Sequence, residues 1–211
     1  MPIEMLTVGA LAENCYIIHE NNKAIIIDPG DEADRIMSIL QEKNLHLEKI
    51  LLTHAHYDHI GAVDILYEKL KPEIFLHKDD NEIYFKASDQ ANYFGLPDLK
   101  VPDALTPIEH NDEIIFEDYS IKVLHTPGHS PGSVCFHFVS EDFVFTGDTL
   151  FKHAIGRTDL PGGDSRKIIP SIKNNLFKLN DDCVVYPGHM MPTTILEEKT
   201  NNPFFGTNMS F

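Results

Sequence analysis

The sequence predicts an α/β fold in which one domain is built from layers of strands and helices. The chain has 211 residues, which is enough for one domain with a full hydrophobic core but short for two. Strand-like runs alternate with helical runs along it, and this alternation indicates layers of both kinds. Clusters of histidine and aspartate follow several strand-like runs, where such scaffolds carry their functional loops. We therefore expect a single domain over residues 1–211.

The first half of the chain contains a predicted β-hairpin followed by alternating helices and strands. Residues 14–28 form the hairpin, which turns at Glu20–Lys23, and Asp31 is placed to cap the helix that follows. A loop with three prolines ends this half, and loops of such length often carry function. The elements expected after the hairpin are helix 32–44, strand 49–53, helix 61–70, strand 73–77, helix 79–90 and loop 92–112.

The second half of the chain is richer in β-structure. Short runs of β-branched and aromatic residues predict four strands, then a helix and a final strand. The four strands are expected at 113–116, 119–125, 133–139 and 143–146, the helix at 165–179 and the final strand at 183–186. The α/β pattern thus extends over nearly the whole chain.

Charge and hydropathy argue against several classes of partner. The formal net charge is −16, from 17 Lys and Arg against 33 Asp and Glu, which leaves little material for the basic surface of a nucleic-acid binder. No apolar run approaches the ~20 residues of a membrane helix. The N-terminus has no basic segment followed by a long apolar one. We therefore expect a cytoplasmic protein with neither membrane nor nucleic-acid partners.

The three cysteines do not suggest a disulfide framework. Cys15, Cys135 and Cys183 are an odd number with no close pair, and each lies in an apolar, strand-like stretch. We predict that they are buried structural thiols.

The strongest functional signal is the segment Thr53-His-Ala-His-Tyr-Asp-His-Ile-Gly61. Neutral imidazoles and an ionised carboxylate suit zinc and other first-row divalent cations. His54 and His56, two apart after a strand, can converge on one ion, whereas Asp58 and His59 begin a new turn and face a second one. A solvated polar loop is the alternative interpretation, but a chance His-x-His-x-Asp-His is rare. The segment therefore predicts metal binding.

Three further clusters place a single ligand beyond the end of a strand. They are Thr126-Pro-Gly-His129, Thr146-Gly-Asp148 and Tyr186-Pro-Gly-His189. Each is weak alone, because turns are rich in exposed histidines and Gly-Asp pairs. The repeated design of strand, glycine and ligand favours a metal role for all three.

Taken in order, these motifs resemble the metallo-β-lactamase superfamily. The resemblance implies a four-layer αββα sandwich with two metal ions in a cleft at one edge of the two sheets. It implies His54, His56 and His129 on one ion, Asp58, His59 and His189 on the other, and Asp148 as the bridge. Asp148 argues against the lactamases themselves, several of which carry a cysteine or a serine nearby.

Within that superfamily, the chain most resembles glyoxalase II, the hydroxyacylglutathione hydrolases. The residues that carry this are Gly147–Phe151, Ile155–Asp159 and Thr200–Phe204, and the match is to a short bacterial type. The longer members append a helical region that binds glutathione, and this chain ends too soon to hold one. The segment Met190–Thr194 departs from the Gly-Pro expected there. The resemblance makes Arg157 either an anchor for a substrate carboxylate or a member of a surface salt bridge.

The chemistry implied is hydrolysis of a small-molecule thioester. Two divalent ions sharing a water would supply a hydroxide, and Asp58 would orient it as the catalytic carboxylate. Asp28 and Tyr57 are candidates for supporting the ligands, with Asp28 expected to buttress a histidine. Zinc is the expected metal, although the ligand set also accepts iron or manganese. We expect a monomer or a small homo-oligomer.

Other functions fit parts of the pattern. A persulfide dioxygenase with a single iron resembles the chain at Gly156-Arg-Thr-Asp159, whereas Ser130-Pro-Gly-Ser133 favours a hydrolase. A lactonase or another esterase would use the same ligands. The negative charge argues against a nuclease, and the absence of cysteine ligands argues against a purely structural zinc module.

Overall fold

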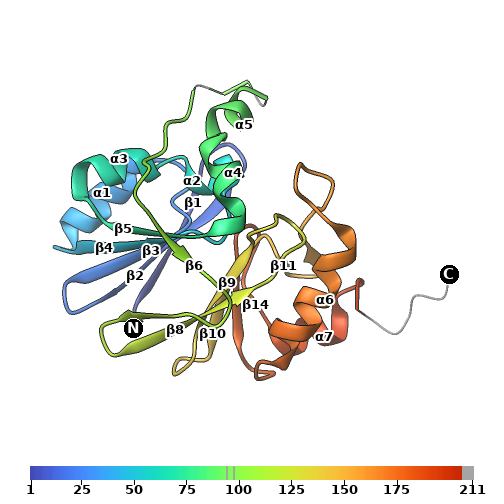
Figure 1. The fold of residues 1–211 in the computed structure, drawn as a ribbon. Helices are drawn as coiled ribbons and strands as arrows, with labels where there is room; N and C mark the ends of the chain where they lie inside the picture. Colours follow the sequence, from blue (N-terminus) through green and yellow to red (C-terminus); the bar gives the residue numbers. More distant parts are fainter. Residues whose placement is uncertain (94, 97, 206–211) are drawn as a thin grey trace. The chain divides into compact units, whose positions relative to one another are not determined.

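The computed structural model describes residues 1–93, 95, 96 and 98–205. These residues form two compact units, Met1–Ile108 and a second that begins at Glu109, each with one six-stranded sheet (Figure 1). The strands and helices within each unit determine where the candidate ligands lie. The assignment of residues 1–211 to one domain stays a prediction.

The first unit contains a mixed sheet in the order β1-β2-β3-β4-β5-β6. The pairs β1–β2 and β2–β3 are antiparallel, whereas β3 to β6 run parallel. Its strands are β1 (Ile3–Val8), β2 (Glu13–Glu20), β3 (Lys23–Ile27), β4 (His46–Leu51), β5 (Glu73–His77) and β6 (Leu105–Ile108). Parallel strands bring their carboxyl ends to one edge, and the histidine-rich loop leaves β4 there.

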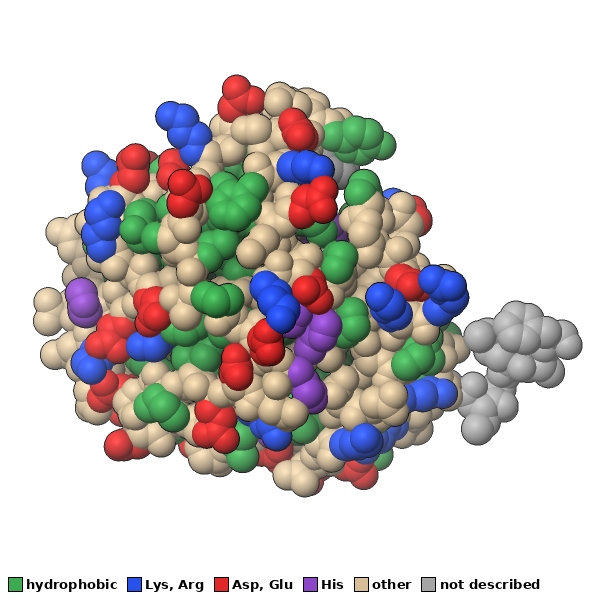
Figure 2. Space-filling view, in the orientation of Figure 1, with side chains coloured by type: hydrophobic (Ala, Val, Ile, Leu, Met, Phe, Trp, Pro, Cys, Tyr) green, Lys and Arg blue, Asp and Glu red, His purple; other side chains and the backbone are tan. Residues whose placement is uncertain are grey.

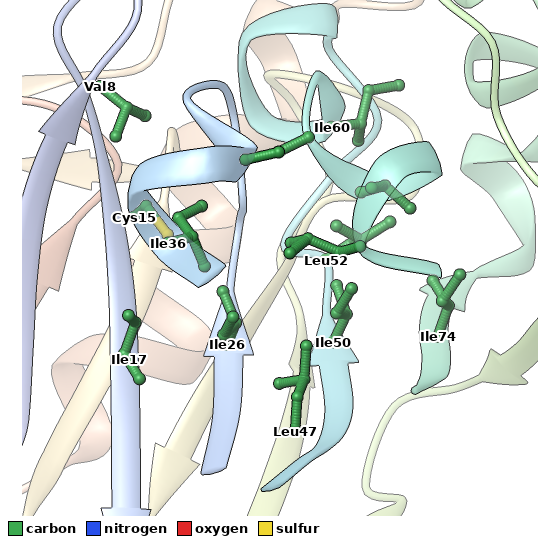
Figure 3. Close-up of a cluster of buried hydrophobic side chains, with 14 of the residues drawn as sticks. Val8, Cys15, Ile17, Ile26, Ile36, Leu47, Ile50, Leu52, Ile60 and Ile74 are labelled. Carbon is green, nitrogen blue, oxygen red and sulfur yellow. The ribbon is translucent and has the colours of Figure 1, made fainter. Parts of the chain in front are cut away.

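Alternation along the strands of the first unit creates a face that is packed by helices. Ile17, Ile26 and Ile50 point to the same face and are fully buried (Figure 3). Ile36 of α1 (Ala33–Glu42) and Leu66 of α3 (Val63–Leu70) belong to the same cluster. The remaining helices of this unit are α2 (Tyr57–Ile60), the 3₁₀ turn η1 (Lys78–Asp80), α4 (Asn81–Phe85) and α5 (Ala87–Tyr93).

The second unit contains a sheet in the order β14-β13-β10-β9-β8-β7. Only β10 and β13 pair in parallel, so their carboxyl ends meet at one edge. The strands are β7 (Glu113–Phe116), β8 (Tyr119–His125), β9 (Val134–Phe138), β10 (Phe143–Gly147), β13 (Val184–Pro187) and β14 (Thr193–Thr194). A short hairpin of β11 (Leu150–Phe151) and β12 (Ala154–Ile155) follows β10.

Helices cover one face of the second sheet. Ile168 and Ile172 of α6 (Ser165–Asn175) pack with Cys135 and Val144 of the strands. Asp164 caps α6, because its side chain accepts a hydrogen bond from the backbone N–H of Arg166. The 3₁₀ turn η2 (Leu176–Lys178) continues α6, and α7 (Ile195–Asn201) follows β14.

Most elements predicted from periodicity are confirmed, and the exceptions have local causes. Asp31 does not cap α1: Glu32 does so in a left-handed conformation, without a side-chain hydrogen bond. The prediction of one loop over 92–112 is wrong where β6 adds an edge strand; Phe94 and Pro97 of that loop lie outside the described residues. Elements missed in the sequence are β1, α2, β11, β12, β14 and α7, which are short, irregular or at an edge.

The charged residues on the described surface are distributed as the low content of Lys and Arg leads one to expect. Lys and Arg side chains are scattered among Asp and Glu on the face drawn in Figure 2, without a continuous basic stripe. No helix in the described ranges is long and apolar enough to cross a membrane. Cys15, Cys135 and Cys183 are buried free thiols, so that prediction is confirmed.

Candidate metal centre

The loop after β4 gathers three imidazoles in the first unit. The ring centroids of His54 and His56 are 4.7 Å apart, and those of His54 and His59 are 4.1 Å apart. All three side chains are buried, although histidine is only intermediate in its tendency to be buried. The three histidines predicted as ligands therefore lie together, and their role as metal ligands stays a prediction.

Asp28 and Thr53 set the orientation and tautomer of two of these histidines. Asp28 Oδ1 accepts from the Thr53 backbone N–H at 2.7 Å, and its Oδ2 accepts from Thr53 Oγ1 at 2.5 Å. The same Oδ2 lies 3.0 Å from His59 Nδ1, and Thr53 Oγ1 lies 3.0 Å from His54 Nδ1.

Both Nδ1 atoms therefore act as donors. A carboxylate only accepts hydrogen bonds, and the Thr53 hydroxyl has already given its proton to Asp28. In a neutral imidazole the lone pair then lies on Nε2, the atom that binds a metal ion. The prediction that Asp28 buttresses a ligand histidine is confirmed for His59.

Asp80 and Gln90 hold the backbone of the loop, and sequence reasoning missed both. Asp80 Oδ2 accepts from the Ala55 N–H at 3.0 Å and is fully buried. The Gln90 side chain donates to the Ala55 carbonyl and accepts from the Tyr57 N–H, at 3.2 Å in each case. Nothing in the local sequence marks these long-range contacts.

Glu13 is a further buried carboxylate that sequence reasoning missed. Its Oε1 lies 3.8 Å from His59 Nδ1, and its side chain is buried. An acidic residue at the start of a strand that is buried over its first six residues was the available signal.

The second unit brings together the other three predicted ligands. His129 follows β8, Asp148 follows β10 and His189 follows β13. Asp148 Oδ2 lies 3.5 Å from His129 Nε2 and 3.7 Å from His189 Nε2. Ligand atoms on one tetrahedral ion with bonds of ~2.0–2.1 Å lie ~3.3 Å apart. These spacings therefore fit a carboxylate that shares ions with both histidines.

His129 has the same tautomer as the histidines of the first unit. Its Nδ1 lies 2.8 Å from the Arg157 carbonyl oxygen, which only accepts hydrogen bonds. Nδ1 therefore carries the proton, and Nε2 carries the lone pair that faces Asp148. Imidazoles supported in this way, together with carboxylates, fit divalent first-row cations.

Two glycines allow the close approach that this arrangement needs. The Gly188 N–H donates to the Gly147 carbonyl at 2.8 Å and so holds the ends of β13 and β10 together. At Gly156, a Cβ would lie 1.8 Å from the Asp148 carbonyl oxygen and 3.2 Å from His129 Cβ. The spacing between Asp148 and the Arg157 loop therefore depends on the absence of a side chain at residue 156.

Gly156→Ala is expected to disturb the centre through this contact. The new methyl group overlaps backbone, so the loop must move, at a cost of about 3 kcal/mol in unfolding free energy. We expect a lower denaturation midpoint and at least a ~10-fold loss of metal affinity. Gly95→Ala is the control without overlap, because a Cβ there meets no atom of the described residues within 4 Å and only the positive φ opposes the change. Equal effects of the two substitutions would contradict this explanation.

Arg157 forms an exposed ion pair with Asp159. Its Nε and a terminal guanidinium nitrogen donate to the two carboxylate oxygens at 2.7 and 2.8 Å. This hydrogen-bonded pair lowers the pKa of Asp159 to about 2. Of the two interpretations of Arg157 drawn from the sequence, the surface salt bridge is therefore present. A role for Arg157 in substrate binding stays a prediction.

Comparison with known proteins identifies the family. The family model described as the metallo-beta-lactamase superfamily matches residues 8–189, a range that includes every predicted ligand. The chain belongs to the metallo-β-lactamase superfamily. Both units contribute His and Asp side chains to groups that could hold a metal ion, as a superfamily of metal-dependent hydrolases leads one to expect.

Relatives with full-length similarity support this membership. The hydroxyacylglutathione hydrolase GloC of Haemophilus influenzae is 40% identical over 98% of this chain and 99% of its own. The structure of TTHA1623 in a di-iron-bound form has a TM-score of 0.89 at 40% identity, over 95% and 99% of the two chains. The BLEG-1 B3 metallo-β-lactamase has a TM-score of 0.90 at 33% identity, over 97% and 99%. The predicted metallo-β-lactamase fold class is therefore confirmed.

Proposed function

We propose that the protein is a binuclear metal-dependent thioesterase of the glyoxalase II type, which cleaves hydroxyacyl thioesters. The similarity to GloC over nearly the full length of both chains carries this proposal. The shared donor role of Nδ1 in His54, His59 and His129 supports it, because it gives each Nε2 a lone pair for an ion.

The ligands within this proposal are those that the resemblance to the family implies. One ion would be held by His54, His56 and His129, the other by Asp58, His59 and His189, with Asp148 shared by both. When bound, the two ions would supply an activated water and polarise the thioester carbonyl. Asp58, whose side chain is only 14% exposed, would orient that water with one of its oxygens.

Zinc is the proposed metal, and iron is the leading alternative. Imidazole and carboxylate ligands accept both ions, so metal availability contributes to the choice. The di-iron form of TTHA1623, at 40% identity, supports two ions and also supports iron. The proposed partner is a small-molecule thioester. A cytoplasmic location, no nucleic-acid or membrane partner, and a monomer or small homo-oligomer stay predictions.

Arg157→Ala tests whether this residue anchors the substrate. If the guanidinium binds a substrate carboxylate, its loss raises KM by about 10-fold or more with little change in kcat, since a charge-assisted hydrogen bond contributes ~1.5–3 kcal/mol. Steady-state kinetics would compare a thioester that carries a carboxylate with a neutral analogue. The neutral substrate should show no change. Unchanged KM values for both would limit Arg157 to its pair with Asp159.

A substrate panel tests the proposed reaction itself. The reconstituted enzyme would be assayed with lactoylglutathione, other acyl thioesters, an oxygen lactone and a β-lactam. The proposal predicts the highest kcat/KM for hydroxyacyl thioesters. The similarity to the BLEG-1 lactamase makes β-lactam hydrolysis the second candidate, and a preference for the β-lactam would replace the thioesterase proposal.

A further inference from the structure

Three different metal-ligating side chains meet in the second unit, away from the proposed hydrolytic centre. His137 lies in β9, Asp142 in the turn between β9 and β10, and Cys183 directly before β13. Asp148 and His189 follow the carboxyl ends of β10 and β13, whereas Asp142 and Cys183 precede their amino ends. The five residues of β10 separate the two locations by about 15 Å.

The three side chains have the spacing of a metal site. One ligand atom from each, an imidazole nitrogen, a carboxylate oxygen and the Cys183 Sγ, lies within 4.8 Å of the other two. A tetrahedral zinc ion with these ligand types has ligand atoms ~3.3–3.7 Å apart. An inward movement of about 1 Å would therefore bring the three atoms to bonding positions.

The surroundings of the cluster hold Asp142 in place. The Asn180 side chain donates to Asp142 Oδ2 at 3.1 Å, and the Val184 N–H donates to the Asp142 carbonyl at 3.1 Å. Asp142 adopts φ of +53°, a left-handed conformation in which aspartate is enriched among non-glycine residues. The turn is thereby fixed against the start of β13, where Cys183 is fully buried.

The side chain of His137 provides the independent evidence that the cluster binds a ligand. Its Nε2 is inaccessible to solvent and has no hydrogen-bond partner in the described part of the chain. A buried polar atom without a partner costs ~1–3 kcal/mol, so such atoms call for an explanation. Burial lowers the pKa of His137; the charge of Asp142 opposes this shift, and the charge of Lys122 adds to it by a smaller amount. The net lowering favours the neutral imidazole, which is the form that binds metals. A hydrogen bond between Cys183 and Asp142 alone would leave Nε2 unexplained.

We propose that His137, Asp142 and Cys183 form a separate cation site that takes zinc or a similar thiophilic divalent ion. Three protein ligands and one water would complete a tetrahedral shell. The ion would replace the thiol proton of Cys183, which burial and Asp142 hold in place by raising the pKa to about 12. It would tie the β9–β10 turn to the start of β13. The strands β10 and β13 lead, at their other ends, to Asp148 and His189.

Cobalt(II) substitution tests this site independently of catalysis. The proposed hydrolytic centre has no cysteine ligand, so a thiolate-to-cobalt charge-transfer band in the near ultraviolet reports only a cysteine site. We expect the full-length protein, stripped of metal and titrated with cobalt(II) in thiol-free buffer, to show this band. Cys183→Ala should abolish it, and His137→Gln should weaken it and lower the cobalt affinity at least ~10-fold. Cys15→Ala and Cys135→Ala are matched controls that should retain the full band.

Two results would overturn the proposal. One is the absence of the band in the wild-type protein after the hydrolytic centre has filled with cobalt, as followed by its d–d absorption. The other is a band that persists in Cys183→Ala or disappears in Cys135→Ala. If Cys183→Ala does not fold, His137→Gln provides the test, because it retains every cysteine and an intact band would remove His137 from the site.

Discussion

Replacing His54 and His56 together by alanine is expected to abolish metal uptake at the His/Asp centre and thioester hydrolysis. Their side chains are buried beyond the end of β4, where His54 also contacts His59. Without them, one ion of the proposed pair has lost two of its ligands. Metal activation contributes several kcal/mol to transition-state stabilisation, so kcat/KM should fall by about 10⁴-fold or more. Metal analysis and steady-state kinetics measure the two effects.

A surface histidine provides the control for this double variant. His46 begins β4 and is exposed, so His46→Ala should retain both the metal content and the activity. Circular dichroism of each variant would show whether the fold survives. A folded double variant that still turned over thioesters at a rate near that of the wild type would contradict the assignment of these ligands.

Asp28→Asn is expected to reduce metal affinity and activity by about 10- to 100-fold while the shape of the side chain is conserved. Asp28 Oδ1 would remain an acceptor for the Thr53 N–H, which places the new amide –NH₂ beside Thr53 Oγ1 and His59 Nδ1. Nδ1 of His59 must then accept a hydrogen bond, so its proton moves to Nε2. The ligand atom of His59 thereby loses its lone pair. Isothermal titration with zinc and steady-state kinetics on the same preparation measure the two losses.

Asp118→Asn is the matched control for this change of one carboxylate. Asp118 is exposed, in the turn between β7 and β8, so its amide variant should bind metal and turn over as the wild type does. Because the substitution changes the tautomer of His59, we also expect the Asp28 variant to lose much of its zinc affinity but little of its thermal stability. A large fall in stability with unchanged zinc affinity would show that Asp28 acts on the fold alone.

The sequence predicted the candidate centre well because its ligands follow a local rule. Each of His54, His129, Asp148 and His189 comes after a strand, and strand ends can be located from hydrophobic periodicity. The spacing of the histidines and the aspartate within His54–His59 is itself typical of metal binding. Asp28 was identifiable as a support because it ends a strand beside the histidine loop.

The parts that were not predicted depend on contacts that are distant in the chain. Asp80 and Gln90 bind the backbone of residues 25 to 35 positions away, and the carbonyl of Arg157 fixes His129 at a separation of 28. No local pattern records such pairs. The helix start at Glu32 shows the same limit at short range, since its left-handed backbone replaces the side-chain cap expected of Asp31.

The number of metal ions held by the His/Asp ligands tests the central claim most directly. Element-resolved mass spectrometry after controlled reconstitution would be performed on Cys183→Ala, so that the additional cation site does not contribute. The same variant carrying His54→Ala and His56→Ala gives the reference. We predict about two ions per chain in the first protein, zinc or zinc with iron, and a clear loss in the second. A single iron per chain that resists further loading would contradict the binuclear hydrolase and favour oxidation of a sulfur substrate.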